Sequence, residues 1–485
     1  MSLTSSLASA LSGLTAASRS IDVVSANVSN AMTDGYAKRE IQLASETVGG
    51  NGAGVKVVGI TRLVNERALA DQREANANSA NAETQADAWL RIETAIGFPT
   101  EDGSLTDRID AFESALISAS SRPEETVRLQ DAISAAVSLA ESINGIADEI
   151  SDVRMDADAD IATMVEDTNT MLQQVETLNW QVFKMGNSGQ DTAALMDERQ
   201  SIIDSLSEII PIRQVNRDGN QVALFTSGGA TLIDGPAAEL SFTPHIIITP
   251  NMTIENGQLS GLELNGEPLS INSTYGSIEG GRLAAAFEVR DSIATEAQSS
   301  IDAIARNLIE RFEDSTLDPS IATSGTGLFT DNDLAFVSTE EVGIANSLKV
   351  NSLVDPAEGG EVWRLRDGIG AAVSGAVGDS SLISALADRI AEATSPTSGP
   401  STGLSRSFTG LASDFLSSID SSFRNQEASQ AFHTARADAL AYELAEDSVD
   451  TDDEMQKLLM IETVYAANAR VIDTIDQLMQ QILEL

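Results

Sequence analysis

Few side chains in this sequence are of the types that carry out catalysis or bind metals. The chain has no cysteine, which excludes disulfides, zinc–thiolate sites, iron–sulfur clusters and thiol nucleophiles. Its two histidines, His245 and His433, are too few for a multi-histidine metal site, and we expect both to be structural rather than part of a Ser-His-Asp relay. A site of paired carboxylates remains an alternative in a chain with 74 acidic residues, and it would lie within residues 210–400.

Two segments are similar to ligand-binding motifs but lack an essential residue. The acidic segment 450–454 lacks the glycine and the spacing of a calcium-binding EF-hand loop. We predict instead that Thr451 and Glu454 form a capping box, with the neighbouring acids stabilising a helix N-terminus. The glycines of 49–54 have the spacing of a phosphate-binding loop, but Val55 stands where a lysine is needed. We therefore predict no catalytic residue, no metal and no cofactor.

The composition narrows the classes of protein further. A formal net charge of −45 argues against binding to nucleic acid or to an anionic membrane surface. No run of about 18 apolar residues predicts a transmembrane helix. The first residues lack the basic start and the continuous apolar run of a cleaved signal peptide, so we expect that any export uses a route without cleavage. With 485 residues, 42% apolar and only 4% aromatic, the chain is expected to form several domains with aliphatic cores.

Two apolar stripes lie at opposite ends of the chain. Their members recur every three or four residues, which is the spacing of a coiled-coil seam. A lone helix with so narrow a stripe buries too little surface to be stable, so we expect the two terminal helices to pair with each other and the pair to pack against other copies. The N-terminal stripe consists of Leu3, Leu7, Ala10, Leu14, Ala17, Ile21, Val24 and Val28, and the C-terminal stripe of Leu458, Ile461, Tyr465, Asn468, Ile472, Ile475, Met479 and Ile482.

Asn468 is the polar member of the C-terminal stripe. A polar residue on such a seam fixes register and oligomeric state at some cost in stability. Local rotation of the helix would instead place it on the flank, and the sequence leaves both positions open.

Helical periodicity dominates the rest of the chain, with a change in pattern at Ile210. In chain order, the predicted elements are a helix at 2–30, a flexible loop at 49–54, a strand at 55–60, and helices at 61–96, 105–120, from 124 onward, at 158–184, at 191–209, at 281–314 and from 408 to the end with a break near 448. Residues 210–280, with strand-like segments at 221–225 and 245–249, predict a β-rich insert. Residues 315–400 are mixed, and form either a second insert or a continuation of the outer region.

The fold is therefore predicted to be mainly α with a β-rich insert, a multidomain α+β protein whose parts are nested. Terminal coiled-coil helices form one end, a long helical bundle follows, and the β-rich part faces outward. The predicted bounds are 1–60 with 441–485 for the terminal assembly domain, 61–209 with 281–314 and 401–440 for the helical rod domain, 210–280 for the β-rich outer domain, and 315–400 for the mixed region.

Residues 26–36 resemble the N-terminal signature of bacterial flagellar rod, hook and hook-associated proteins. The family pattern is roughly A-N-x-x-N-x-x-T-x-G-Y, and this chain has Asp34 where many members have proline before the glycine. Residues 450–485 resemble the closing segment of the same family. The residues that carry the two signatures are Asn27, Asn30, Thr33, Gly35 and Tyr36 at the N-terminus and Ala467, Asn468 and Arg470 at the C-terminus.

Three internal stretches resemble the hook-associated members that join hook and filament. They are 54–62 running into 67–73, 195–200 before Ile202 and Leu206, and 280–283 followed by 287–291. This resemblance implies a secreted structural protein at the hook–filament junction of the extracellular flagellum. It also implies unfolded export through the flagellar type III channel, and terminal helices that order on assembly.

The implied partners are other copies in a ring, hook subunits below, a second junction protein toward the filament, and a cytoplasmic export chaperone on the C-terminal helix. The nearest alternative is a hook or rod subunit, which the long helical region 62–205 disfavours. The remaining alternatives are an exported enzyme or an adhesin with its site in the central insert.

Overall fold

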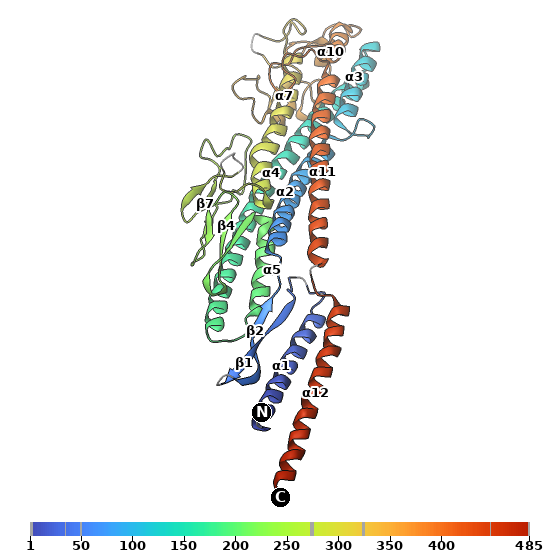
Figure 1. Ribbon diagram of the computed structural model, residues 1–485. Coiled ribbons are helices and arrows are strands. Elements are labelled where there is room, and N and C mark those ends of the chain that lie inside the picture. The colour runs from blue at the N-terminus through green and yellow to red at the C-terminus, as the bar shows by residue number, and fades with distance from the viewer. Residues whose placement is uncertain are drawn as a thin grey trace.

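The chain forms an elongated molecule with both ends of the chain at one tip (Figure 1). The computed structural model describes residues 3–33, 35–48, 51–271, 276–322, 325–446 and 448–483. At the tip, α1 (Leu3–Ser29) and α12 (Thr451–Leu483) lie side by side, and long helices form the rest of the body. The predicted fold class, mainly α with a β-containing insert, is confirmed.

A β-hairpin connects α1 to the body. Strands β1 (Arg39–Val48) and β2 (Asn51–Arg62) pair antiparallel, and β2 packs against α1, where the Val55 amide donates to Ser12 Oγ at 3.1 Å. The prediction of a loop at 49–54 is wrong for 51–54, because these residues pair with the end of β1; residues 49 and 50 lie outside the described part, as does Asp34. Glycines weaken a strand locally, but the ladder to β1 supplies hydrogen bonds that the local pattern does not reveal.

The body is built on long helices that pack along one another. They are α2 (Glu66–Ile96), α3 (Leu105–Ser121), α4 (Thr126–Asn187), α5 (Ala193–Ile209), α6 (Gly281–Glu288), α7 (Ala294–Phe312), α10 (Ser381–Ala391) and α11 (Phe408–Glu446), with a π-helical turn at Val289–Ile293 between α6 and α7. Side-chain caps begin two of them, as Asn65 accepts from the Ala68 amide and Ser104 from the Asp107 amide. The break at 97–99 lies between α2 and α3, as predicted.

One uninterrupted helix, α4, replaces the two that were predicted from residue 124 and at 158–184. The prediction is wrong because the polar residues around Asp158 have the local pattern of a boundary between two helices. In the structure Asp158 is fully buried and its charge is met by Arg290 from the π-helical turn, so the helix continues through it.

Two apolar cores follow each other along the body. The first joins α3, α4, α7, α10 and α11, and it contains a cluster of Phe112, Phe312 and Phe329 whose ring centroids lie 5.3 to 6.0 Å apart. The mixed region contributes to the same core with β9 (Phe329–Asp331), α8 (Ile344–Ser347), β10 (Leu348–Val350) and α9 (Arg364–Asp367). Hence residues 315–400 are packed onto the helices rather than set apart from them.

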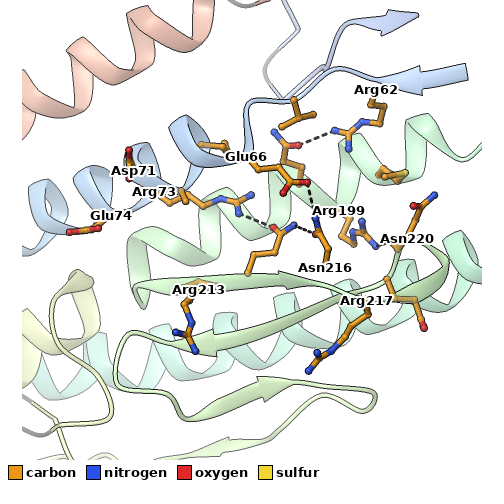
Figure 2. Close-up of a pocket in the computed structure, with 18 of the residues that line it drawn as sticks. Arg62, Glu66, Asp71, Arg73, Glu74, Arg199, Arg213, Asn216, Arg217 and Asn220 are labelled. Carbon is orange, nitrogen blue, oxygen red and sulfur yellow. Dashed lines mark hydrogen bonds between the residues drawn. The ribbon is translucent and has the colours of Figure 1, made fainter. Parts of the chain in front are cut away.

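The second core joins α4, α5 and α6 to two small antiparallel sheets. Their strands are β3 (Ile212–Asn216), β4 (Val222–Thr226) and β5 (Thr231–Ile233), and β6 (Leu240–Ser241), β7 (Leu262–Leu264) and β8 (Glu267–Leu269). Arg73 of α2 connects the first sheet to the helices. Its Nε donates to Asp204 of α5 at 2.6 Å. Another nitrogen of Arg73 donates to Gln214 of β3 at 2.9 Å (Figure 2).

The predicted strand at 245–249 is irregular instead, and Ile246 is 95% exposed. Arg154 of α4 donates to the carbonyl oxygens of Thr249, Pro250 and Met252, and the His245 amide donates to Asp158. Backbone groups that a sheet partner would satisfy are thus satisfied by side chains of α4. The local apolar pattern predicts a strand here because it carries no information on those distant partners.

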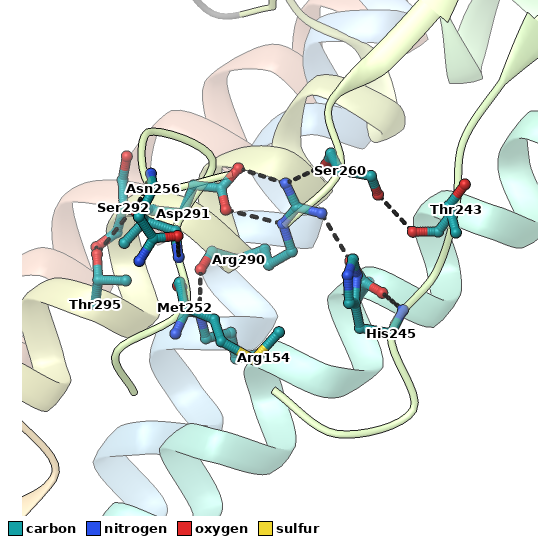
Figure 3. Close-up of polar contacts among 12 residues, drawn as sticks. Arg154, Thr243, His245, Met252, Asn256, Ser260, Arg290, Asp291, Ser292 and Thr295 are labelled. Carbon is teal, nitrogen blue, oxygen red and sulfur yellow. Dashed lines mark hydrogen bonds and ion pairs between the residues drawn. The ribbon is translucent and has the colours of Figure 1, made fainter. Parts of the chain in front are cut away.

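A buried ion pair holds the π-helical turn against α4 (Figure 3). Arg290 donates to Asp158 at 2.7 Å, and both side chains are fully buried. The same guanidinium donates to Asp291 at 2.8 and 2.9 Å and to the Ser260 carbonyl at 3.1 Å. Arg154 donates to the Arg290 carbonyl at 2.9 Å, so one cluster connects α4, the turn and the β-containing region.

Asp302 of α7 makes the stability of the body depend on pH. Burial raises the pKa of its carboxyl group to about 6 from 3.8, against the lowering effect of hydrogen bonds from the Gly343 and Ala345 amides. Because the unfolded chain loses this proton at lower pH than the folded chain, the contribution of Asp302 to stability falls as pH rises from about 4 to about 6.

Substitution Asp302→Asn is expected to remove this pH dependence. Between pH 5 and pH 7, the wild type should lose about 1 kcal/mol more unfolding free energy than the variant. Urea unfolding of both proteins at the two pH values measures the difference. Parallel pH profiles would show that Asp302 stays ionised in the folded chain.

Candidate assembly surface and its joint to the body

The two predicted stripes meet only in part within one chain. Of the N-terminal stripe, Ala10, Ala17 and Val24 are buried, Leu3, Leu14, Ile21 and Val28 are half-buried, and Leu7 is exposed. Of the C-terminal stripe, Ile475 is buried, Leu458, Ile461, Asn468 and Ile472 are half-buried, and Tyr465, Met479 and Ile482 are exposed. Much of the contact thus uses the small residues of α1 and the middle of α12.

Asn468 lies on the side of α12 that faces α1. A Cβ atom at Gly13 would lie 2.7 Å from Asn468 Nδ2, so the asparagine fits against the bare glycine backbone. The close approach places Asn468 within the contact between the two helices of a single chain. Ala467 and Arg470, beside it in the closing segment, are exposed.

A second apolar row on α12 was missed by the sequence reasoning. These side chains are between 43% and 69% exposed, and the four of the row recur at spacings of four or seven residues beside the predicted stripe. They are Met460, Val464, Val471 and Leu478, flanked by Met455 and Leu459. A second helical period in the same segment was the available signal, because a helix with two apolar faces has more than one partner.

Asn27 of the N-terminal signature joins α1, the hairpin and α12. Its Nδ2 donates at 2.9 Å both to Glu454 Oε2 and to the Arg39 carbonyl. Its Oδ1 accepts from the Tyr36 hydroxyl at 2.9 Å and from the Arg39 amide at 3.0 Å. With four bonds the buried amide group is fully satisfied, which explains why asparagine occupies this position.

Glu454 does not form the predicted capping box with Thr451. Asp450 caps α12 instead, accepting from the amides of Asp452 and Asp453 at 2.9 and 3.2 Å. Glu454 is 1% exposed and bonds to Asn27 and, at 2.8 Å, to Lys457. The prediction is wrong because a tertiary partner competes with the helix N-terminus for this carboxylate, and the sequence does not show that partner.

The other signature residues shape the turn after α1. Asn30 Nδ2 donates to the Ala26 carbonyl at 2.9 Å, and the Tyr36 amide donates to the Thr33 carbonyl at 3.1 Å. Gly35 has φ of +75°, and a Cβ there would meet Ser201 of α5 at 3.4 Å. The positive φ of this turn therefore favours glycine, whereas a Cβ would meet Ser201 only at ordinary van der Waals distance.

Asp197 of α5 anchors the hairpin to the body. Its carboxylate accepts from Arg39 and from Arg62, each at 2.7 Å, and from the Ala37 amide at 3.3 Å. Arg62 also donates to Gln200 at 2.9 Å. Two stretches that resembled hook-associated proteins, 54–62 and 195–200, thus meet at one point, which we call the joint.

Charge around Tyr36 reflects the same packing. Burial raises the pKa of the Tyr36 hydroxyl, the Arg39 guanidinium lowers it, and the carboxylates of Asp197 and Glu454 raise it. The Arg39 guanidinium lies 4.9 Å from the centre of the Tyr36 ring. The tyrosine is therefore held both by its hydroxyl and by its ring.

Within the described ranges, no group of three or more His, Asp or Glu side chains is arranged to hold a metal ion. None of the helices in the part of the chain that the structure describes is long and apolar enough to span a bilayer.

Substitution Asn27→Ala is expected to loosen the contact between α1, the hairpin and α12. It leaves the Tyr36 hydroxyl, both Arg39 backbone groups and Glu454 without this partner, a cost of about 1 to 3 kcal/mol. Amides of α1 and β1 should exchange with solvent about tenfold faster or more than in the wild type. Asn30→Ala, which removes a bond within the same turn only, is the control, and equal exchange in the wild type and Asn27→Ala would refute the role.

Comparison with known families matches three separate segments of the chain. Residues 7–36 match "Flagella basal body rod protein", residues 91–317 match "Flagellar hook-associated protein FlgK helical domain", and residues 447–485 match "Flagellar basal body rod FlgEFG protein C-terminal". The first and last contain α1 and α12, and the second contains most of the body.

Individual relatives agree with these matches. Flagellar hook-associated protein 1 of Bacillus subtilis is 23% identical over 98% of this chain and 97% of its own length. The proteins of the same name from Salmonella typhimurium and Escherichia coli are 25% and 22% identical, over 47% and 56% of this chain and 42% and 52% of their own. The flagellar hook junction protein FlgK from Burkholderia pseudomallei overlaps with a TM-score of 0.43 at 20% identity, covering 54% of this chain and 46% of that one. By its sequence matches, the chain is similar along nearly its whole length to flagellar hook-associated protein 1.

Proposed function

We propose that this protein is a structural component of the bacterial flagellum that forms the junction between hook and filament. The observation that carries the proposal is the pairing of the two chain ends at one tip, with an apolar row of α12 left uncovered. A helix pair buried on one side and apolar on another gains stability when further copies cover it. The names of the relatives supply the location.

In this proposal the terminal helices make the contacts between copies. The predicted stripes and the second row of α12 would both be covered in a ring of copies. Hook subunits would lie on one side of the ring and a second junction protein on the other. Before export, the C-terminal helix would be held by a cytoplasmic chaperone, which would protect the same apolar residues.

The domain bounds predicted from the sequence are part of the proposal. The terminal assembly domain comprises 1–60 and 441–485, and the helical body and β-containing region carry the outer surface. The joint at Asp197 would set the angle between them, because it is the point where the hairpin is bonded to α5. The protein would act outside the cell as a scaffold without catalysis.

A deletion strain tests the proposal. Electron microscopy of cells that lack the gene should show hooks without filaments, with unpolymerised flagellin in the medium. The strain carrying a plasmid copy of the gene is the control and should have normal filaments. Absence of hooks would move the protein to a hook or rod role, and normal motile filaments in the deletion strain would refute a junction role.

A further inference from the structure

A pocket of about 490 Å³ lies where β2, α2, α5 and β3 meet, apart from the α1–α12 pair (Figure 2). This volume is typical of pockets that bind small molecules. Its lining includes Arg62, Arg73, Arg199, Gln200, Gln214 and Asn216. The concentration of guanidinium groups is unusual in a chain with 29 basic and 74 acidic residues.

Arg199 places a positive charge in the wall of the pocket without a counter-charge. It is 4% exposed, and one of its terminal nitrogens donates to Asn179 Oδ1 and to the Asn220 carbonyl, both at 2.7 Å. Both acceptors are neutral, and among the described residues no carboxylate forms an ion pair with it. Burial, together with the nearby Arg62 guanidinium, lowers the pKa of Arg199 to about 10. A buried charge of this kind is unfavourable unless an anion compensates for it.

On the adjacent wall of the pocket, one nitrogen of the Arg73 guanidinium lacks a hydrogen-bond acceptor. Its Nε bonds to Asp204 and one terminal nitrogen bonds to Gln214. The other terminal nitrogen is buried and has no hydrogen-bond partner among the described residues. Arg199 thus lacks a carboxylate partner, and Arg73, although paired with Asp204, lacks one hydrogen-bond acceptor.

The carboxylates that line the pocket do not neutralise the positive charge of Arg199. Glu66 accepts from Asn216 Nδ2 at 2.7 Å and forms no ion pair with Arg199, whose pKa is affected by burial and Arg62 only. Asp71 and Glu74 lie farther along α2, away from Arg199 (Figure 2). Arg217, at the rim, is already paired with Asp234. The uncompensated positive charge is therefore localised at Arg199, with Arg62 and Arg73 beside it.

We propose that this pocket binds a small molecule through a carboxylate or phosphate group placed against Arg199. The planar guanidinium group matches the geometry of both oxyanions, and Arg62, which shares the carboxylate of Asp197 with Arg39, adds to the attraction. The neutral side chains of Gln200 and Gln214 contribute further polar contacts on either side. The site is distinct from the proposed contacts between copies, and its binding does not require assembly.

Titration calorimetry of the full chain with sodium citrate and with sodium phosphate tests this site, each against sodium chloride of matched ionic strength. We expect saturable binding of one anion per chain, complete within about 10 mM. Stronger binding of citrate would assign a carboxylate ligand, and stronger binding of phosphate a phosphorylated one. Absence of saturable binding for both anions would overturn the proposal.

Isosteric variants locate the site without removing a buried arginine. Gln200→Glu and Gln214→Glu keep the hydrogen bonds to Arg62 and Arg73 but supply an internal carboxylate, so each should weaken anion binding about tenfold or more. Gln258→Glu, an exposed residue that also accepts a hydrogen bond, carries the same charge change and should bind like the wild type. Equal binding by all four proteins would place the anion elsewhere and refute the assignment.

Discussion

A chain truncated before Asp450 is expected to fold its helical body and to fail completely in assembly. The truncation removes α12, so the apolar residues of α1 lose their cover and Asn27 loses the acceptor Glu454. An isolated helix with so narrow an apolar stripe is unstable in water. The two cores of the body contain no residue of α12, so its unfolding midpoint should change little.

The measurement is complementation of the deletion strain with the truncated gene, followed by electron microscopy and urea unfolding of the purified chain. Phe432→Ser is the matched control, because it removes an exposed aromatic side chain from α11, outside both α12 and the terminal segments 1–60 and 441–485. This variant should restore filaments. Filaments of normal length with the truncated chain would contradict the assembly role of α12.

The substitution Arg290→Met is expected to destabilise the body by about 3 to 5 kcal/mol. Methionine keeps much of the apolar volume but leaves the fully buried Asp158 carboxylate without its ion pair, and the Ser260 carbonyl without its donor. The lost contacts with the rings of Phe287 and Phe242 add to the effect. Urea unfolding measures the change.

Two comparisons separate burial of charge from loss of the arginine itself. Arg424→Met breaks an exposed ion pair with Asp420 and should leave the unfolding free energy almost unchanged. The double variant Arg290→Met with Asp158→Leu removes both buried charges and should recover part of the loss. If the Arg290 and Arg424 variants changed stability equally, the buried pair would not be a main support of this region.

Local patterns determined the helices and their order along the chain. The stripes beginning at Leu3 and Leu458 predict helices because spacing alone decides which side chains share a face, and the structure has α1 and α12 there. The break at 97–99 follows in the same way from glycine and proline. The signature residues Asn27 and Gly35 were identified from the resemblance of 26–36 to the flagellar family pattern, and the structure adds their contacts.

The partners of those residues depended on distant parts of the chain. Glu454 reads locally as a helix cap, yet it is buried against Asn27, 427 positions earlier. The apolar segment 245–249 has the pattern of a strand. In the fold it is irregular, because Arg154 donates hydrogen bonds to the carbonyl groups of Thr249 and Met252. The local pattern around Asp158 indicates a helix end. In the fold, Arg290 neutralises the Asp158 carboxylate and the helix continues. Periodicity reports how a segment divides its own side chains between water and protein, whereas the free energy of a buried charge or backbone group depends on which partner the fold brings within hydrogen-bond distance.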